Sequence, residues 1–120
     1  MSASRFSLNQ ASIKHAGMEE AVRATVAAGI PAIGAWREPV AEYGLERSAA
    51  LIRDAGLRVS SLCRGGFFTV EEGPRRRAAI DDNRAALAEA HALGAPTLVL
   101  VVGGLPEGSR DLRGEVRVPP

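Results

Sequence analysis

The sequence predicts a parallel α/β fold in which strands alternate with amphipathic helices. Three segments share one pattern, a helix that ends at a glycine and leads directly into a short apolar strand: AVRATVAAGIPAIGAW, AALIRDAGLRVSSLC and ALAEAHALGAPTLVLVV. Gly29, Gly56 and Gly94 stand at these junctions, where a residue in the left-handed conformation can end a helix. Strands and helices that alternate in this way form parallel sheets.

The expected strands are short and almost continuously apolar, which is typical of parallel strands that are covered on both faces. A first strand over residues 5–9 precedes the repeats. The strands that follow span residues 31–36, 57–63 and 97–102.

The expected helices follow from apolar side chains that recur every three or four residues. They span residues 17–28, 44–55 and 75–93. Their apolar faces consist of Met18, Val22 and Val26, of Leu45, Ala49 and Ile52, and of Ala79, Ala86, Ala90 and Leu93. Charged residues occupy the opposite faces, so each helix is expected to pack one face on the sheet.

Four strands and three full helices amount to a partial TIM barrel, one half of the (β/α)8 fold, which takes about 250 residues when complete. The alternative is a doubly wound open sheet. Strand order separates the two, because 1-2-3-4 supports the barrel and 2-1-3-4 supports a flavodoxin-like sheet. We predict one partial barrel domain over residues 1–120.

The end of the chain departs from this pattern. Ser109 could cap a fourth helix over residues 110–118, but Pro119 and Pro120 would end it at once. We therefore expect an atypical tail over residues 112–120 in place of a full helix.

Composition argues against a macromolecular partner. Fifteen basic and 14 acidic residues leave a net charge of +1, so no strong field attracts nucleic acid or an anionic membrane. Cys63 is the only cysteine, which excludes an internal disulfide and suits a reducing compartment. The longest apolar stretch is far shorter than the roughly 20 residues of a membrane helix. We expect a cytoplasmic protein.

Ligands of parallel α/β folds bind beyond the carboxyl ends of the strands. Asn9 follows the first strand, and Trp36 and Arg37 follow the second. An indole wall beside a guanidinium suits a sugar phosphate, because the ring packs on C–H groups and the cation binds oxyanions. The equally supported alternative is that Trp36 closes the core and Arg37 is solvated.

Glycines and one further arginine follow the third and fourth strands. Arg64 could bind an anion, and Gly65 and Gly66 could bring backbone N–H groups close to it. Gly103 and Gly104 allow the same interpretation after the fourth strand. Glycine pairs more often only turn the chain, so a structural role is favoured for both pairs.

His15 and Cys63 are the remaining candidates for catalysis. His15 lies in the loop after the first strand, on the functional side, and is a weak candidate for an acid, a base or a substrate contact. Cys63 would need a basic partner to act as a nucleophile, whereas His91 lies within the last helix and is expected to be a surface or packing residue. Only Glu38, among 14 acids, is placed near a strand end, so no metal site is expected in this chain.

The segments SLNQASI, GIPAIGAWREPVAEYGLERSAALIRDAGLRVSSLCRGGFF and NRAALAEAHALGAPTLVLVVGGLP resemble the N-terminal half of the xylose-isomerase-like TIM barrel family of sugar phosphate isomerases and epimerases. The resemblance covers about residues 5–112, and its most specific parts are the Trp-Arg after the second strand and SLCRGGFF. It implies a barrel that binds a divalent metal, Mg²⁺, Mn²⁺, Co²⁺ or Zn²⁺, and moves a proton next to a sugar carbonyl.

By position, the resemblance places Asn9, His15, Trp36, Arg37, Arg64 and the turn at Gly103 and Gly104 on the substrate side. Family metal ligands and catalytic acids come chiefly from strands five to eight, which are not expected here. The departure near Leu112 suggests a truncated or frame-shifted product.

The leading hypothesis is therefore the N-terminal part of a metal-dependent sugar or sugar phosphate isomerase or epimerase, inactive alone. One alternative is a non-catalytic half barrel that forms a homodimer through its exposed strand edges or docks on a complementary half. Another is an open-sheet domain that binds small molecules. A metal-dependent endonuclease is disfavoured by the near-neutral charge.

Overall fold

The computed structural model describes residues 3–70 and 72–104 of the chain. In these ranges the strands form one parallel sheet in the order β1-β2-β3-β4. The strands are β1 (Leu8–Asn9), β2 (Ala32–Trp36), β3 (Arg58–Gly66) and β4 (Leu98–Val101). This order is the one that a partial barrel requires, and it confirms the predicted fold class over the flavodoxin-like sheet.

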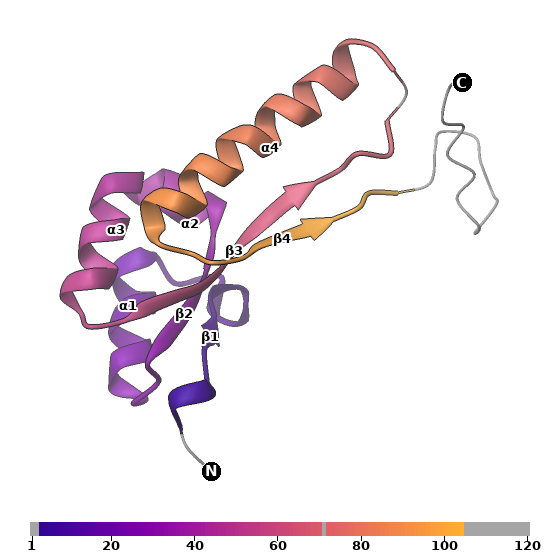
Figure 1. The fold of residues 1–120 in the computed structure, drawn as a ribbon. Coiled ribbons are helices and arrows are strands. Elements are labelled where there is room, and N and C mark those ends of the chain that lie inside the picture. The colour runs from indigo at the N-terminus through magenta and orange to yellow at the C-terminus, as the bar shows by residue number, and fades with distance from the viewer. Residues whose placement is uncertain (1–2, 71, 105–120) are drawn as a thin grey trace.

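The helices connect the strands and lie together on one face of the sheet (Figure 1). They are α1 (Met18–Ala27), α2 (Arg37–Tyr43), α3 (Leu45–Asp54) and α4 (Pro74–Leu93), with short 3-10 turns η1 (Ala3–Arg5) and η2 (Gln10–Ile13) near β1. Gly94 ends α4 in the left-handed conformation, with φ of 69°, as the glycine at the junction predicts.

The core lies between β2, β3 and the helices. Ile33 of β2 and Leu62 of β3 are fully buried, and they belong to one apolar cluster with Val22 of α1 and Ile52 of α3. Burial of each large aliphatic side chain contributes about 1.5–3 kcal/mol to folding. The alternation of β2 turns Ile33 and Ala35 toward the helices, so Trp36 at the strand end is on the other face.

Three elements differ from the expected ones. β3 extends to Gly66, so Arg64, Gly65 and Gly66 lie within the strand and not after it as expected. Residues 37–43 form the separate helix α2, which periodicity missed because Val40 is its only buried residue. Pro39 is tolerated there since it lies in the first turn, where a backbone N–H has no partner within the helix. β1 is shorter than the expected 5–9, because residues 3–5 form η1 and only Leu8 and Asn9 pair with β2.

The helix considered for residues 110–118 and the tail over 112–120 lie outside the described residues. That the chain is a single domain stays a prediction.

Candidate functional site

Asn9 and Trp36 meet where β1 and β2 end. The indole Nε1–H of Trp36 donates to Oδ1 of Asn9 at 2.8 Å, and the same oxygen accepts from the N–H of Ala11 at 3.0 Å. The backbone N–H of Trp36 donates to Oε1 of Gln10 at 2.9 Å. Both ends of the tryptophan are therefore held by the segment that follows β1, and its ring has a fixed orientation.

Arg64 completes this group from the neighbouring strand. Its guanidinium carbon lies 5.7 Å from the ring centre of Trp36 and 5.4 Å from that of Phe67, within the range of cation–π attraction. Glu38 is 3.9 Å away, at the limit of an ion pair, and the Arg64 side chain is 43% exposed. A half-exposed cation between two aromatic rings can bind an anionic group from solvent.

Arg37 is engaged within the protein. Its guanidinium donates to both oxygens of Asp82 at 2.9 and 3.0 Å, and to both oxygens of Glu89 at 2.6 and 3.1 Å. The hydrogen bonds that Arg37 donates to Asp82 and Glu89 raise the pKa of Arg37, and the one that Asp82 accepts lowers the pKa of Asp82. Arg37 therefore fastens α2 to α4, which neither of its two sequence-based interpretations anticipated.

Gly65 and Gly66 let α4 approach β3 closely. The N–H of Gly66 donates to Oδ1 of Asn83 at 2.6 Å, and Nδ2 of Asn83 donates to the carbonyls of Gly66 and Ala79, each at 2.8 Å. A Cβ on Gly65 would lie 2.5 Å from Oδ1 of Asn83. The Gly66 N–H already has a buried partner. The contacts of Gly65 and Gly66 therefore favour a structural role over the binding of an anion.

Sequence reasoning missed Asn83. The signal was available, since Asn83 is a polar residue on the face of α4 that carries Ala79, Ala86 and Ala90. A polar residue on an otherwise apolar helix face is expected to have a buried hydrogen-bond partner.

Gly103 fits a structural role as well. Its φ is 123°, and a Cβ there would clash with Oγ1 of Thr69, so the chain after β4 passes tightly against the loop after β3. Gly104 has open space around it. A contact of Gly103 or Gly104 with a substrate stays a prediction.

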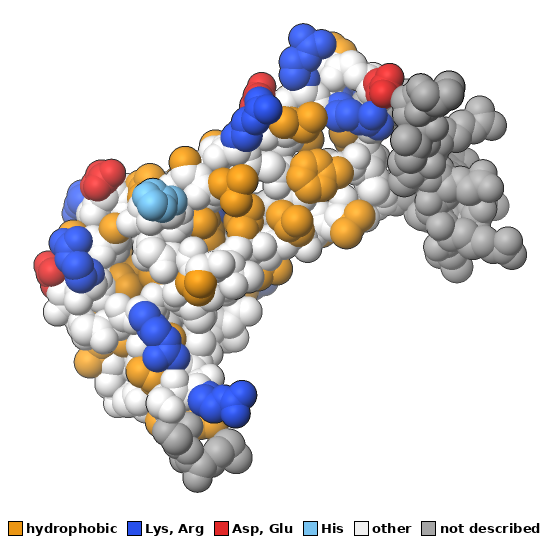
Figure 2. All heavy atoms as spheres, viewed as in Figure 1, with side chains coloured by type: hydrophobic (Ala, Val, Ile, Leu, Met, Phe, Trp, Pro, Cys, Tyr) orange, Lys and Arg blue, Asp and Glu red, His pale blue; other side chains and the backbone are white. Residues whose placement is uncertain are grey.

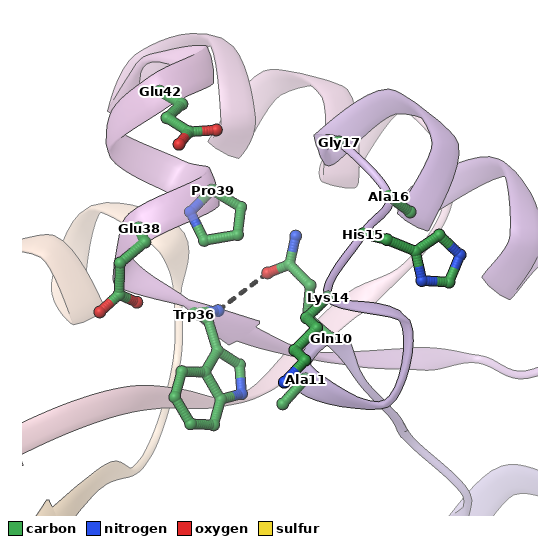
Figure 3. Close-up of a pocket in the computed structure, with 10 residues that line it drawn as sticks. All are labelled: Gln10, Ala11, Lys14, His15, Ala16, Gly17, Trp36, Glu38, Pro39 and Glu42. Atoms are coloured by element: carbon green, nitrogen blue, oxygen red, sulfur yellow. Dashed lines mark hydrogen bonds between the residues drawn. The ribbon is translucent and has the colours of Figure 1, made fainter.

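His15 lies beside a cavity of about 500 Å³ between η2 and α2. Figure 3 shows its ring pointing away from Gln10 and Trp36. The structure places His15 on the carboxyl-end side of the sheet but does not bring it to Arg64, and its catalytic role stays a prediction. His91 is exposed on α4, as expected.

Cys63 pairs in register with Trp36 of β2 and Val99 of β4. Burial raises the pKa of its thiol, which opposes formation of the thiolate that a nucleophile requires. In residues 3–70 and 72–104, no three His, Cys, Asp or Glu side chains come together in a group that could hold a metal ion. No helix among those residues is long and apolar enough to cross a membrane.

The strand order defines a partial parallel βα barrel. The chain belongs to the xylose isomerase-like TIM barrel family, whose pattern is matched by residues 22–117. No curated protein sequence matches the chain.

Two crystal structures resemble the chain. Protein SMc04130 from Sinorhizobium meliloti 1021 is 46% identical, with a TM-score of 0.85 over 92% of this chain and 40% of that one. A xylose isomerase domain containing protein from Salmonella typhimurium LT2 shares the fold, with a TM-score of 0.71 at 15% identity over 83% of this chain and 37% of that one. The chain therefore spans about two fifths of the length of each of these proteins.

Proposed function

We propose that this chain is the N-terminal half of a divalent-metal-dependent sugar or sugar phosphate isomerase or epimerase, and that it supplies part of the substrate mouth. The observation that supports this proposal is the cluster of Asn9, Trp36, Arg64 and Phe67 at the ends of three neighbouring strands. Such a cluster suits a sugar ring with an anionic group.

The proposed role of each residue follows from its contacts. The Trp36 ring packs against the C–H groups of the sugar, and Asn9 and Gln10 fix its orientation. Arg64 binds the phosphate oxygens by charge-assisted hydrogen bonds. Arg37 takes no part, because Asp82 and Glu89 occupy its guanidinium.

The proposal assigns no proton transfer and no metal to this half. The described residues do not fit a divalent cation, since no three of their His, Cys, Asp or Glu side chains come together. We propose that the metal of the whole enzyme, Mg²⁺, Mn²⁺, Co²⁺ or Zn²⁺, is held by strands beyond β4, and that the chain alone is inactive.

Two measurements test the proposal. The chain is incubated with a panel of aldoses, ketoses and their phosphates in the presence of each metal, and we expect no isomerisation or epimerisation. Fluorescence of Trp36, the only tryptophan, is expected to report binding of a sugar phosphate. Arg64→Gln should weaken that binding about tenfold, whereas Arg53→Gln, at a 74% exposed side chain, should not change it.

Metal-dependent turnover by the chain would contradict its inactivity. Binding that is equal in Arg64→Gln and the unaltered chain would contradict the assigned mouth.

A second candidate function, self-association, is favoured by β4. Val99, Leu100 and Val101 are 39%, 52% and 42% exposed, and Figure 2 shows apolar side chains gathered over β4 and the adjoining part of α4. We propose that two copies pair through these edges, because a free apolar edge strand is a template for another strand. Light scattering should give a dimer, and Val101→Lys should give a monomer. A well-folded monomer of the unaltered chain would count against edge pairing.

A further inference from the structure

The cavity between η2 and α2 shares Gln10 and Trp36 with the proposed mouth, and it also carries charged groups that the proposed mouth does not use. Its volume is about 500 Å³, and its polar walls include Gln10, Lys14, His15, Glu38 and Glu42. We propose that it binds a small zwitterion, a molecule with a carboxylate and an ammonium group a few bonds apart, as in a free amino acid. This inference does not rest on the isomerase proposal.

Gln10 provides the first argument. Its side chain is 1% exposed, and its Oε1 accepts from the backbone of Trp36. Its Nε2 carries two N–H donors, yet the acceptor within the described residues is Sδ of Met18 at 3.7 Å. Thioether sulfur is a weak acceptor, and a buried donor without a good acceptor is unfavourable. Figure 3 shows this nitrogen pointing into the space between η2 and α2, where a ligand oxygen would satisfy it.

The wall that contains Gln10 favours a negative group. Lys14 and His15 follow η2 and line the cavity. Gly17 caps the ten-residue helix α1 and has no side chain to accept from the first N–H groups of that helix. A helix start without a side-chain cap attracts a negative charge, part of which Glu19 and Glu20 of the first turn already supply, and the Lys14 ammonium adds a full positive charge. A carboxylate is therefore expected to bind at this wall.

The opposite wall favours a positive group. Glu38 and Glu42 stand on α2 (Figure 3). Glu42 has no partner among the described residues, and the contact of Glu38 with Arg64 is long, at 3.9 Å. A simple carboxylate would be repelled by these glutamates, and a simple amine by Lys14. A ligand that carries both charges fits both walls, which is the reason to propose a zwitterion.

Two residues that occur once make the test direct. Trp36 lines the cavity and is the only tryptophan, and Lys14 is the only lysine. The full chain is titrated with L-alanine, L-leucine and L-phenylalanine, which differ in side-chain size. Lactate, which lacks the ammonium group, and ethylamine, which lacks the carboxylate, serve as matched half-ligands. Saturable change in Trp36 fluorescence is expected with at least one amino acid and with neither half-ligand.

Protection of Lys14 gives an independent readout. Reductive methylation followed by mass spectrometry compares Lys14 with the α-amino group of the same chain as an internal reference. The amino acid that binds should slow methylation of Lys14 and leave the α-amino group unchanged.

Variants test which charged side chains of the cavity contact the ligand. Glu42→Gln and Lys14→Gln should each weaken binding about tenfold, the effect of losing one charge-assisted hydrogen bond. Glu46→Gln, at an exposed acid on α3 outside the cavity, should leave binding within about twofold. Circular dichroism checks that each variant is folded. The proposal is overturned if no amino acid binds, if lactate binds as tightly as L-alanine, or if Glu46→Gln weakens binding as much as Glu42→Gln.

Discussion

β2 and β4 have similar apolar sequences, but the described part of the chain covers them differently. Ala32, Ile33 and Ala35 of β2 are 0% exposed, because β2 has a strand on each side and helices on one face. Among the described strands β4 pairs with β3 alone, and Leu100 is 52% exposed. β4 therefore has the composition of an interior strand at the position of an edge strand, and its stabilising contacts are fewer.

The largest expected effect compares these strands directly. Ile33→Ala removes a fully buried side chain and should lower the free energy of unfolding by about 2–5 kcal/mol. In the monomeric chain Val101→Ala, at a 42% exposed position of β4, should change it by about 0.5 kcal/mol. Urea unfolding followed by circular dichroism measures both. Equal losses of unfolding free energy would show that β4 is as fully buried as β2, for example in a dimer.

The second prediction concerns the buried contact that holds the end of β3. Asn83→Leu leaves the N–H and the carbonyl of Gly66 without their partner, and each unsatisfied buried group costs about 1–3 kcal/mol. We expect unfolding free energy to fall by about 2–3 kcal/mol. Arg84→Leu, at a 75% exposed position of the same helix, should change it by less than about 0.5 kcal/mol.

Asn83→Asp separates the two hydrogen bonds that the asparagine makes with Gly66. The aspartate still accepts from the N–H of Gly66 but cannot donate to the carbonyl when it is ionised. A stability equal to that of the unaltered chain would contradict a role for Nδ2.

The fold could be predicted from the sequence because the patterns that indicate it are local. Each junction glycine, each apolar helix face and the apolar strand over residues 97–102 could be read within a dozen residues. α2 could not be predicted in this way, since a helix of seven residues with Val40 as its only buried residue has no periodic pattern.

The candidate site could be predicted only in part for the same reason. Asn9, Trp36 and Arg64 could be placed at strand ends by counting along strands, and the structure brings these three together. The engagement of Arg37 could not be predicted, because Asp82 and Glu89 lie 45 and 52 residues away along the chain. Which of two neighbouring arginines stays free for a ligand depends on such long-range contacts.

The smallest expected effect tests the ion pair between Arg37 and Asp82 through its dependence on pH. Arg37 lowers the pKa of Asp82 in the folded state, so the pair stabilises the fold above the ordinary pKa of an aspartate, about 3.9, and the stabilisation is lost as pH falls through the lowered value. Arg37→Met should therefore cost about 1 kcal/mol at pH 6, a modest amount because Asp82 is 55% exposed.

Below about pH 4 the difference between Arg37→Met and the unaltered chain should begin to shrink, and it should be lost as pH falls through the lowered pKa of Asp82, because that carboxylate then takes up a proton. Urea unfolding at pH 6, 4 and 3 measures this difference. Arg53→Met, whose guanidinium is 74% exposed, should show no such dependence. A difference that is the same at all three pH values would mean that Arg37 stabilises α2 and α4 by packing of its aliphatic part, and that its charge contributes nothing.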